Sequence, residues 1–149
     1  MENIALPKKV DFLAGKNENE GVVIVEPLYP GYGMTLGNSL RRVLLSSLPG
    51  SAVVGVKIKG ASHEFMTLPG IQEDVLEIML NIKQLHLKIH GDEEVRLELK
   101  VKGKQIATAA DIAKNSQVEI KNPELIIASL TDEKASLELE IFARSGRGY

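Results

Sequence analysis

The sequence predicts an α+β fold with a largely antiparallel sheet. Segments with period-two alternation outnumber segments with helical periodicity, and only two helices are expected. These two helices are inserted singly among the strands, whereas a doubly wound parallel fold needs a helix after nearly every strand. A hydrophobic content of 44% in 149 residues provides enough apolar side chains for a core.

The first fifty residues predict two strands and one helix. Residues 10–26 read as two strands joined by the polar loop AGKNENEG, and the second strand is the β-branched run GVVIVEP. Pro27 and Pro30 then mark a bend. The stretch GYGMTLGNSLRRVLLSSLPG, residues 31–50, predicts a helix preceded by a glycine-containing turn.

A strand and a second helix are expected next. In AVVGVKIKG, Val54, Val56 and Ile58 alternate with glycine and lysine, which predicts a half-buried strand. LPGIQEDVLEIMLNIKQ, residues 68–84, predicts a helix with acidic residues early and Lys83 late. Its expected buried face has the spacing i, i+4, i+7, i+8, i+11 and comprises Ile71, Val75, Ile78, Met79 and Ile82.

The remaining chain predicts short strands. LHLKI and VRLELKV alternate on either side of HGDEE, which predicts a hairpin. Further strands are expected in QIATAADI, QVEI and LIIASL. ASLELEIFA predicts a last strand with Leu137, Leu139 and Ile141 on one face, and RSGRGY reads as the start of a loop.

Composition excludes several classes of protein. With 18 basic and 20 acidic residues the net charge is −2, so the chain has no overall basic footprint for nucleic acid. The absence of cysteine excludes disulfides and thiolate metal sites. No apolar run approaches the roughly 20 residues of a membrane span, and the N-terminus lacks the layout of a signal peptide. A soluble intracellular protein is expected.

Residues 31–50 allow three interpretations. A phosphate loop at Gly31–Gly37 would make the chain a small nucleotide-binding protein, but the glycines miss the G-x-G-x-x-G spacing. No acidic residue between Glu26 and Glu64 could bind a ribose. A basic nucleic-acid contact would need more clustered cations than Arg41 and Arg42.

The third interpretation is a helix with two contact faces. At 100° per residue, one arc carries an ordinary core stripe, Leu36, Leu40, Val43, Leu44 and Leu48, and Ser39 lies on a small-residue edge. Leu45 lies on nearly the opposite side, beside Asn38, Arg41 and Arg42. A leucine among polar residues is typical of a polar-rimmed contact surface. The residues alone leave a multi-partner helix and a plain amphipathic helix open.

An ordered series of motifs resembles the bacterial-type RNA polymerase alpha subunit, in its N-terminal domain. The resemblance spans nearly the whole chain and rests on GYGMTLGNSLRRVLLSSLPG, HEF (63–65), PGIQEDVLEIMLNIK (69–83), TAADI (108–112), LTDEKA (130–135) and GRGY (146–149). It implies a non-catalytic platform that forms a homodimer with a second alpha chain and recruits the beta and beta-prime subunits of a nucleotidyltransferase complex for transcription. A cytoplasmic location is implied, or a plastid one for an organellar protein.

The resemblance also implies a domain organisation and contact residues. Residues 1–50 are the first part of a dimerisation subdomain, and residues 51–149 form an inserted β-rich subdomain that is incomplete at its C-terminal end. The family's later DNA-binding domain is absent, so no direct DNA binding is expected. The contact for a large subunit is assigned to Arg42 and Leu45, with Asn38 and Arg41 beside them, and a further contact to Asp132-Glu133.

Groups able to do chemistry are sparse. His86 and His90 have too few converging ligands for a metal site, and His63-Glu64 lacks a nucleophile. No catalytic residue, cofactor or metal is therefore expected in this chain.

Overall fold

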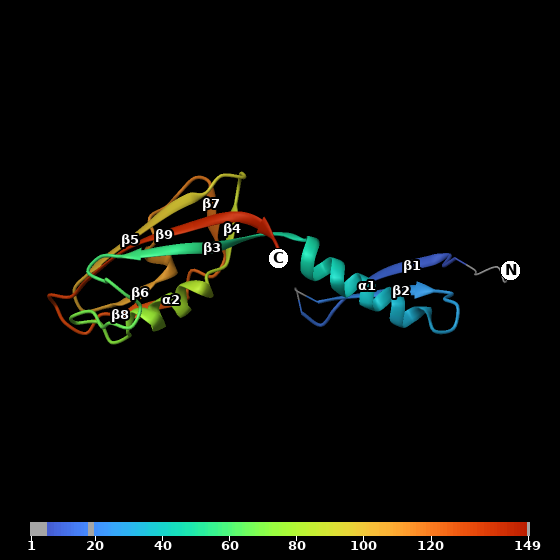
Figure 1. Ribbon diagram of the computed structural model, residues 1–149, viewed down its shortest axis with the longest axis horizontal. Helices are drawn as coiled ribbons and strands as arrows, with labels where there is room; N and C mark the ends of the chain where they lie inside the picture. The colour runs from blue at the N-terminus through green and yellow to red at the C-terminus, as the bar shows by residue number, and fades with distance from the viewer. Residues whose placement is uncertain (1–5, 18–19, 149) are drawn as a thin grey trace. The chain divides into compact units, whose positions relative to one another are not determined.

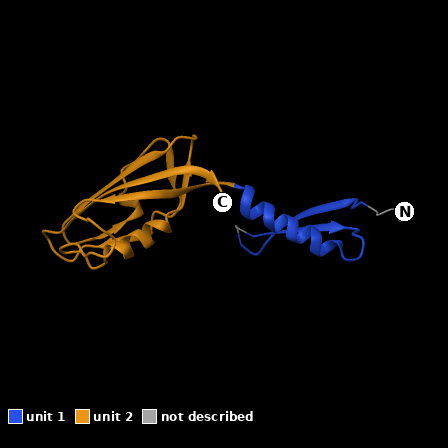
Figure 2. Cartoon of the chain, in the orientation of Figure 1, with its two compact units in different colours: residues 1–48 blue, residues 49–149 orange. Residues whose placement is uncertain are grey.

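The computed structural model describes residues 6–17 and 20–148, so the polar loop expected after the first strand lies partly outside the described residues. The chain divides into two compact units, Met1–Leu48 and Pro49–Tyr149 (Figure 2). The boundary falls between the first helix and the strand that follows it.

Unit 1 contains a hairpin and a helix. Strands β1 (Lys9–Ala14) and β2 (Gly21–Glu26) pair antiparallel, with Lys9 opposite Glu26 and Ala14 opposite Gly21. The helix α1 (Tyr32–Ser47) follows. Tyr29 and Tyr32 meet edge to face at the start of this helix, with ring centroids 5.8 Å apart.

Unit 2 is built on a three-stranded antiparallel sheet (Figure 1). Its central strand is β9 (Ser136–Arg147), flanked by β3 (Pro49–Ile58) and β5 (Val95–Lys102). Along β5 the side chains alternate between buried and outward-facing. The inner face of the sheet packs into the core through Leu97, Leu99, Leu137, Leu139 and Ile141.

Two smaller ribbons and a helix complete this core. Strand β4 (Leu87–Ile89) pairs with β7 (Val118–Ile120), and β6 (Ile106–Thr108) pairs with β8 (Ile126–Ser129). A short 3-10 turn, η1 (Ala109–Asp111), follows β6. The helix α2 (Val75–Lys83) contributes Val75, Ile78 and Ile82 to the core.

The α+β class and the largely antiparallel pairing are confirmed, because every strand pair in the described part of the chain is antiparallel. The hairpin expected between LHLKI and VRLELKV is wrong, since β4 pairs with β7 and β5 pairs with β9. Alternation fixes which face of a strand is buried but not which strand lies beside it.

Two further boundaries differ from expectation. The second helix begins only at Val75, because Asp74 caps it: the Asp74 side chain accepts from the Glu77 amide, and the Glu77 side chain accepts from the Asp74 amide. Ile71 is buried outside the helix in a bridge to Leu130, and Met79 faces outward. The loop expected at RSGRGY is mostly strand, since β9 continues to Arg147 opposite Pro49.

Candidate assembly surface

The helix α1 has few stabilising features of its own. Its N-cap, Gly31, has a left-handed φ of 89° and supplies no side-chain hydrogen bond. Its first turn has no acidic residue and its last turn no basic one. Since helices in proteins are stabilised mainly by packing of an apolar face, α1 depends on contacts made through its surface.

The position of this helix argues against a phosphate loop at Gly31–Gly37. It begins at Tyr32, so Gly33 and Gly37 are helical residues and no glycine loop spans Gly31–Gly37. The nucleotide-binding alternative is therefore not supported.

The apolar stripe of α1 is exposed. The exposed fractions are 45% for Leu40, 54% for Val43 and 57% for Leu44, and Leu48 just after the helix is 56% exposed. Leu36 is half-buried, and Ser39 on the small-residue edge is exposed. No residue of α1 is buried, so the stripe expected to be core is uncovered in the described part of this chain.

The opposite face of α1 carries the predicted contact residues. Asn38, Arg41 and Arg42 are exposed, and Leu45 is 65% exposed. The Arg41 guanidinium donates to Asn38 Oδ1 at 3.3 Å. The Arg42 guanidinium has no hydrogen bond or ion pair with any residue that the structure describes. The charged group of Arg42 is therefore available to a partner, on the same face of the helix as the exposed Leu45.

The small-residue edge of α1 needs no polar partner. Ser39 Oγ donates to the Thr35 carbonyl at 2.8 Å, and Ser46 Oγ donates to the Arg42 carbonyl at 2.7 Å. Their hydroxyl hydrogens are therefore satisfied within the helix, and this edge can approach an apolar surface closely.

The hairpin of unit 1 is equally uncovered. Phe12 is 79% exposed, and no described residue of this unit is buried. The exposed large apolar side chains of the hairpin strands are Val10, Phe12, Leu13, Val22, Val23 and Ile24, and Leu6 is exposed just before β1. Exposed apolar area on this scale marks an interaction surface.

Unit 2 has an apolar stripe that the sequence analysis missed. On the outer side of α2, Leu76 is 38% exposed, Met79 is 42% exposed and Leu80 is 53% exposed. The signal was present in VLEIMLNIK, which is apolar on both sides of the helix. Met79 also lines a hollow of about 300 Å³ between α2, β3 and residues 61–64.

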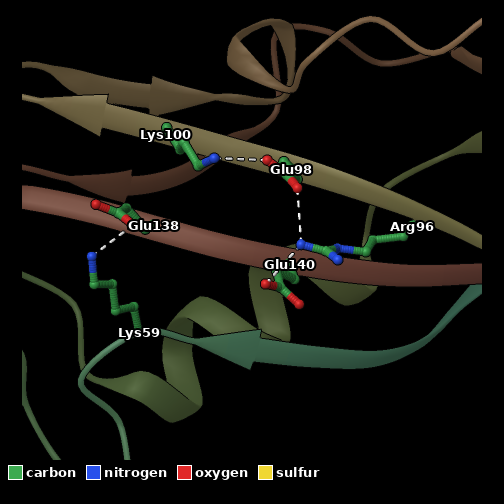
Figure 3. A network of polar contacts seen from close by, with 6 residues as sticks. All are labelled: Lys59, Arg96, Glu98, Lys100, Glu138 and Glu140. Atoms are coloured by element: carbon green, nitrogen blue, oxygen red, sulfur yellow. Dashed lines mark hydrogen bonds and ion pairs between the residues drawn. The ribbon is translucent and has the colours of Figure 1, made fainter.

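The outer face of the large sheet is covered by paired charges (Figure 3). Arg96 lies between Glu98 and Glu140 at 2.9 Å from each, and Lys59 contacts Glu138 at 2.9 Å. Hydrogen bonding from Lys100 lowers the pKa of Glu98, and Lys59 lowers that of Glu138 in the same way. Because each of these carboxylates already has a cation, the hollow over this face offers no unpaired acid.

The histidines form no catalytic or metal cluster in the described part of the chain. His90 Nε2 lies 2.8 Å from Glu119 Oε1, while the His86 backbone amide donates to Asn122 Oδ1. His63 and Glu64 are exposed in the loop after β3. No group of three potential metal ligands occurs among the described residues. No described helix is long and apolar enough to cross a membrane.

The fold is α+β with exposed apolar surfaces on both units, and sequence comparison gives its family. Residues 56–149 match the RNA polymerase Rpb3/RpoA insert domain, and the chain belongs to this family. The similar curated proteins carry the name DNA-directed RNA polymerase subunit alpha, which confirms the resemblance to the bacterial-type alpha subunit.

Three of these relatives illustrate the similarity. The protein of Carboxydothermus hydrogenoformans is 53% identical over 89% of this chain and 42% of its own length. That of Oceanobacillus iheyensis is 50% identical over 100% of this chain and 47% of its own length. That of Bacillus velezensis is 57% identical over 87% of this chain and 41% of its own length. The chain thus spans about half the length of the relatives it matches.

Proposed function

We propose that this chain is a non-catalytic assembly subunit of DNA-dependent RNA polymerase, which forms a dimer with a second alpha chain and recruits the beta and beta-prime subunits. The observation that carries the proposal is α1, a helix of 16 residues with an apolar stripe and no buried residue. Such a helix is stabilised when other chains cover it. From the polymerase role we infer a cytoplasmic location, or a plastid location for an organellar protein.

The apolar side of α1 is assigned to the second alpha chain. Leu40, Val43 and Leu44 supply the buried area that a dimer needs, and the neighbouring serine edge permits a close approach. The remaining stripe residues, Leu36, Ser39 and Leu48, extend the same surface.

The opposite side of α1 is assigned to a large subunit. An unpaired guanidinium can bind carboxylates or carbonyls in a bidentate manner, and Arg42 is available for this. Leu45 supplies the apolar centre, with Asn38 and Arg41 at its rim. The outer stripe of α2 is a second apolar surface for a large subunit.

The pairing of β3 with β9 supports the proposed domain organisation. Because Arg147 lies opposite Pro49, a chain continuing beyond β9 returns to the point where α1 ends. We infer that residues 1–50 begin the dimerisation subdomain and residues 51–149 form most of an insertion within it.

Reconstitution with the large subunits tests the proposal. Arg42→Ala should weaken capture of the large subunits by about tenfold or more, since interface arginines often contribute 2 kcal/mol or more. The matched control is Arg144→Ala, an exposed arginine of unit 2. Normal capture by Arg42→Ala, or unfolding of this variant in circular dichroism, would contradict the assignment.

Catalysis supplies a second test. The purified chain should not extend RNA on a template with nucleotides and Mg²⁺, because no acidic metal-binding cluster occurs among its described residues. RNA synthesis by the chain alone would overturn the non-catalytic role.

A further inference from the structure

The outer face of the large sheet carries an excess of positive charge. The six residues drawn in Figure 3, together with Lys57 and Lys102, form what we call the charged face. It combines five lysine and arginine side chains with three glutamates, so its net charge is +2 although the whole chain has a net charge of −2. A positive face on an acidic chain attracts an acidic partner.

The three carboxylates of the charged face are held by its own cations. Glu98 and Glu140 lie directly opposite each other on β5 and β9, where two like charges would repel. The Arg96 guanidinium lies 2.9 Å from both carboxylates and holds them together (Figure 3). Lys59 binds Glu138 at 2.9 Å. The acidic groups are therefore satisfied within the face, and the charge that remains for a partner is positive.

This remaining charge belongs to Lys57 and Lys102. Both are exposed, and neither side chain forms an ion pair with any residue that the structure describes. Lys57 on β3 lies opposite Glu140 of β9, and Lys102 on β5 lies opposite Ser136 of β9. Because the two lysines flank the central strand at positions four residues apart along it, their Cα atoms are about 16 Å from each other.

We propose that the charged face is a docking surface for an extended acidic segment of a partner protein. Lys57 binds one carboxylate of this segment, and Lys102 binds a second about five residues away, because an extended chain covers about 16 Å in that length. Exposed ion pairs are individually weak, so the face acts mainly by speeding association. The inference concerns unit 2 alone and does not depend on the role proposed for α1.

The central strand decides between an acidic peptide and nucleic acid as the partner. A line from Lys57 to Lys102 crosses β9 at Glu138, which lies midway between Glu140 and Ser136. A peptide with uncharged residues between its two acids avoids repulsion by this carboxylate. A nucleic-acid backbone carries a negative charge at every nucleotide and meets Glu138 with one of them. The arrangement therefore favours the peptide.

Two hexapeptides of the same composition, with blocked ends, test the spacing. One has a glutamate at each end with glycine and serine between them, and the other has its two glutamates side by side. Proton–nitrogen NMR of residues 1–149 at low ionic strength measures the backbone amide shifts at a fixed millimolar peptide concentration. The amides of Lys57 and Lys102 should shift at least about threefold more with the spaced peptide, because only this peptide reaches both lysines. Equal shifts with the two peptides would overturn the proposal.

Neutral variants separate these two lysines from the other cations of the chain. Lys57→Gln combined with Lys102→Gln should remove the response to the spaced peptide, and glutamine keeps part of the aliphatic stem so that the sheet stays folded. The matched control combines Lys83→Gln with Lys114→Gln, two exposed lysines that form no ion pair with a described residue. It should respond as the wild type does. A full response in the first variant, or a lost response in the control, contradicts the assignment.

A short DNA duplex tests the other class of partner. At an equal concentration of negative charge it should shift the amides of the charged face less than the spaced peptide does, because its backbone is repelled by Glu138. Larger shifts with the duplex at the same amides would show that the face binds nucleic acid, and the proposed acidic peptide would then be wrong.

Discussion

At the residue scale, Gly70 shows that two motifs far apart in the sequence, PGIQEDVLEIMLNIK and LTDEKA, pack closely together. Its φ is 75°, and a Cβ added there would lie 2.8 Å from the Cβ of Ala135. The Gly70 carbonyl accepts from both the amide and the hydroxyl of Thr131. The two motifs therefore contact each other directly in the fold. Their separation in the sequence does not reveal this contact.

Gly70→Ala should destabilise the protein by about 1–3 kcal/mol, because it combines an unfavourable φ with a steric clash. Urea unfolding measures the loss. Gly50→Ala is the control, since a Cβ at position 50 meets nothing within 4 Å. Equal stabilities of the two variants would contradict this account.

Glu119 provides a prediction for pH. Hydrogen bonds from Lys121 and then His90 lower the pKa of Glu119 to about 2, from an ordinary value of 4.5. A depressed pKa in the folded state stabilises the protein above pH 4.5, and this contribution is lost as the pH falls toward 2. The stability difference between the wild type and Glu119→Gln should therefore shrink over that range.

Carbon-13 NMR checks the titration directly. The Glu119 carboxyl signal should still report an ionised group at about pH 3.5, where an unperturbed glutamate is mostly protonated. A midpoint near 4.5 would show that the contacts with Lys121 and His90 do not persist in solution.

At the scale of elements, periodicity predicted burial better than it predicted partners. The alternation in Val95–Lys102 identified the buried face of β5, but its actual neighbour β9 begins more than thirty residues later. For α1, the helical periodicity of the sequence separated an apolar stripe from the face that carries Asn38 and Leu45. It could not reveal that both faces are exposed in the described part of the chain. Coverage by other segments depends on tertiary contacts that no local pattern contains.

Two leucines on different elements should respond differently to truncation. Leu139→Ala removes a side chain that is 2% exposed in the central strand, so a loss of about 2–5 kcal/mol is expected. Leu40 is 45% exposed on α1, so Leu40→Ala should cost below about 1 kcal/mol in the isolated chain. Thermal and urea unfolding measure the free energy of unfolding of both variants. A large loss of stability in Leu40→Ala would indicate that α1 is covered in solution.

At the scale of the whole molecule, apolar burial is uneven. All buried apolar residues belong to unit 2 among the described residues, while unit 1 keeps its apolar side chains exposed. The family predicted from the sequence motifs is confirmed, because ordered motifs specify a family even where individual strand pairings are mispredicted.

The isolated chain should bind a hydrophobic dye and dimerise weakly. The uncovered stripe of α1 and the apolar hairpin supply the dye-binding surface. Residues 49–149, which contain the buried core, should bind much less dye. Sedimentation equilibrium and dye fluorescence measure both properties; a tight dimer of residues 1–149 that binds no dye would show that α1 and the hairpin close the interface unaided.

The central position of β9 has a consequence for synthesis on the ribosome. Both β3 and β5 pair with β9, which is the last of the strands in unit 2. A nascent chain therefore carries two strands that have no partner in this sheet until β9 emerges. Such long-range closure slows folding and prolongs the exposure of apolar strands. We therefore expect the nascent chain to be prone to aggregate during the interval between the synthesis of β5 and that of β9.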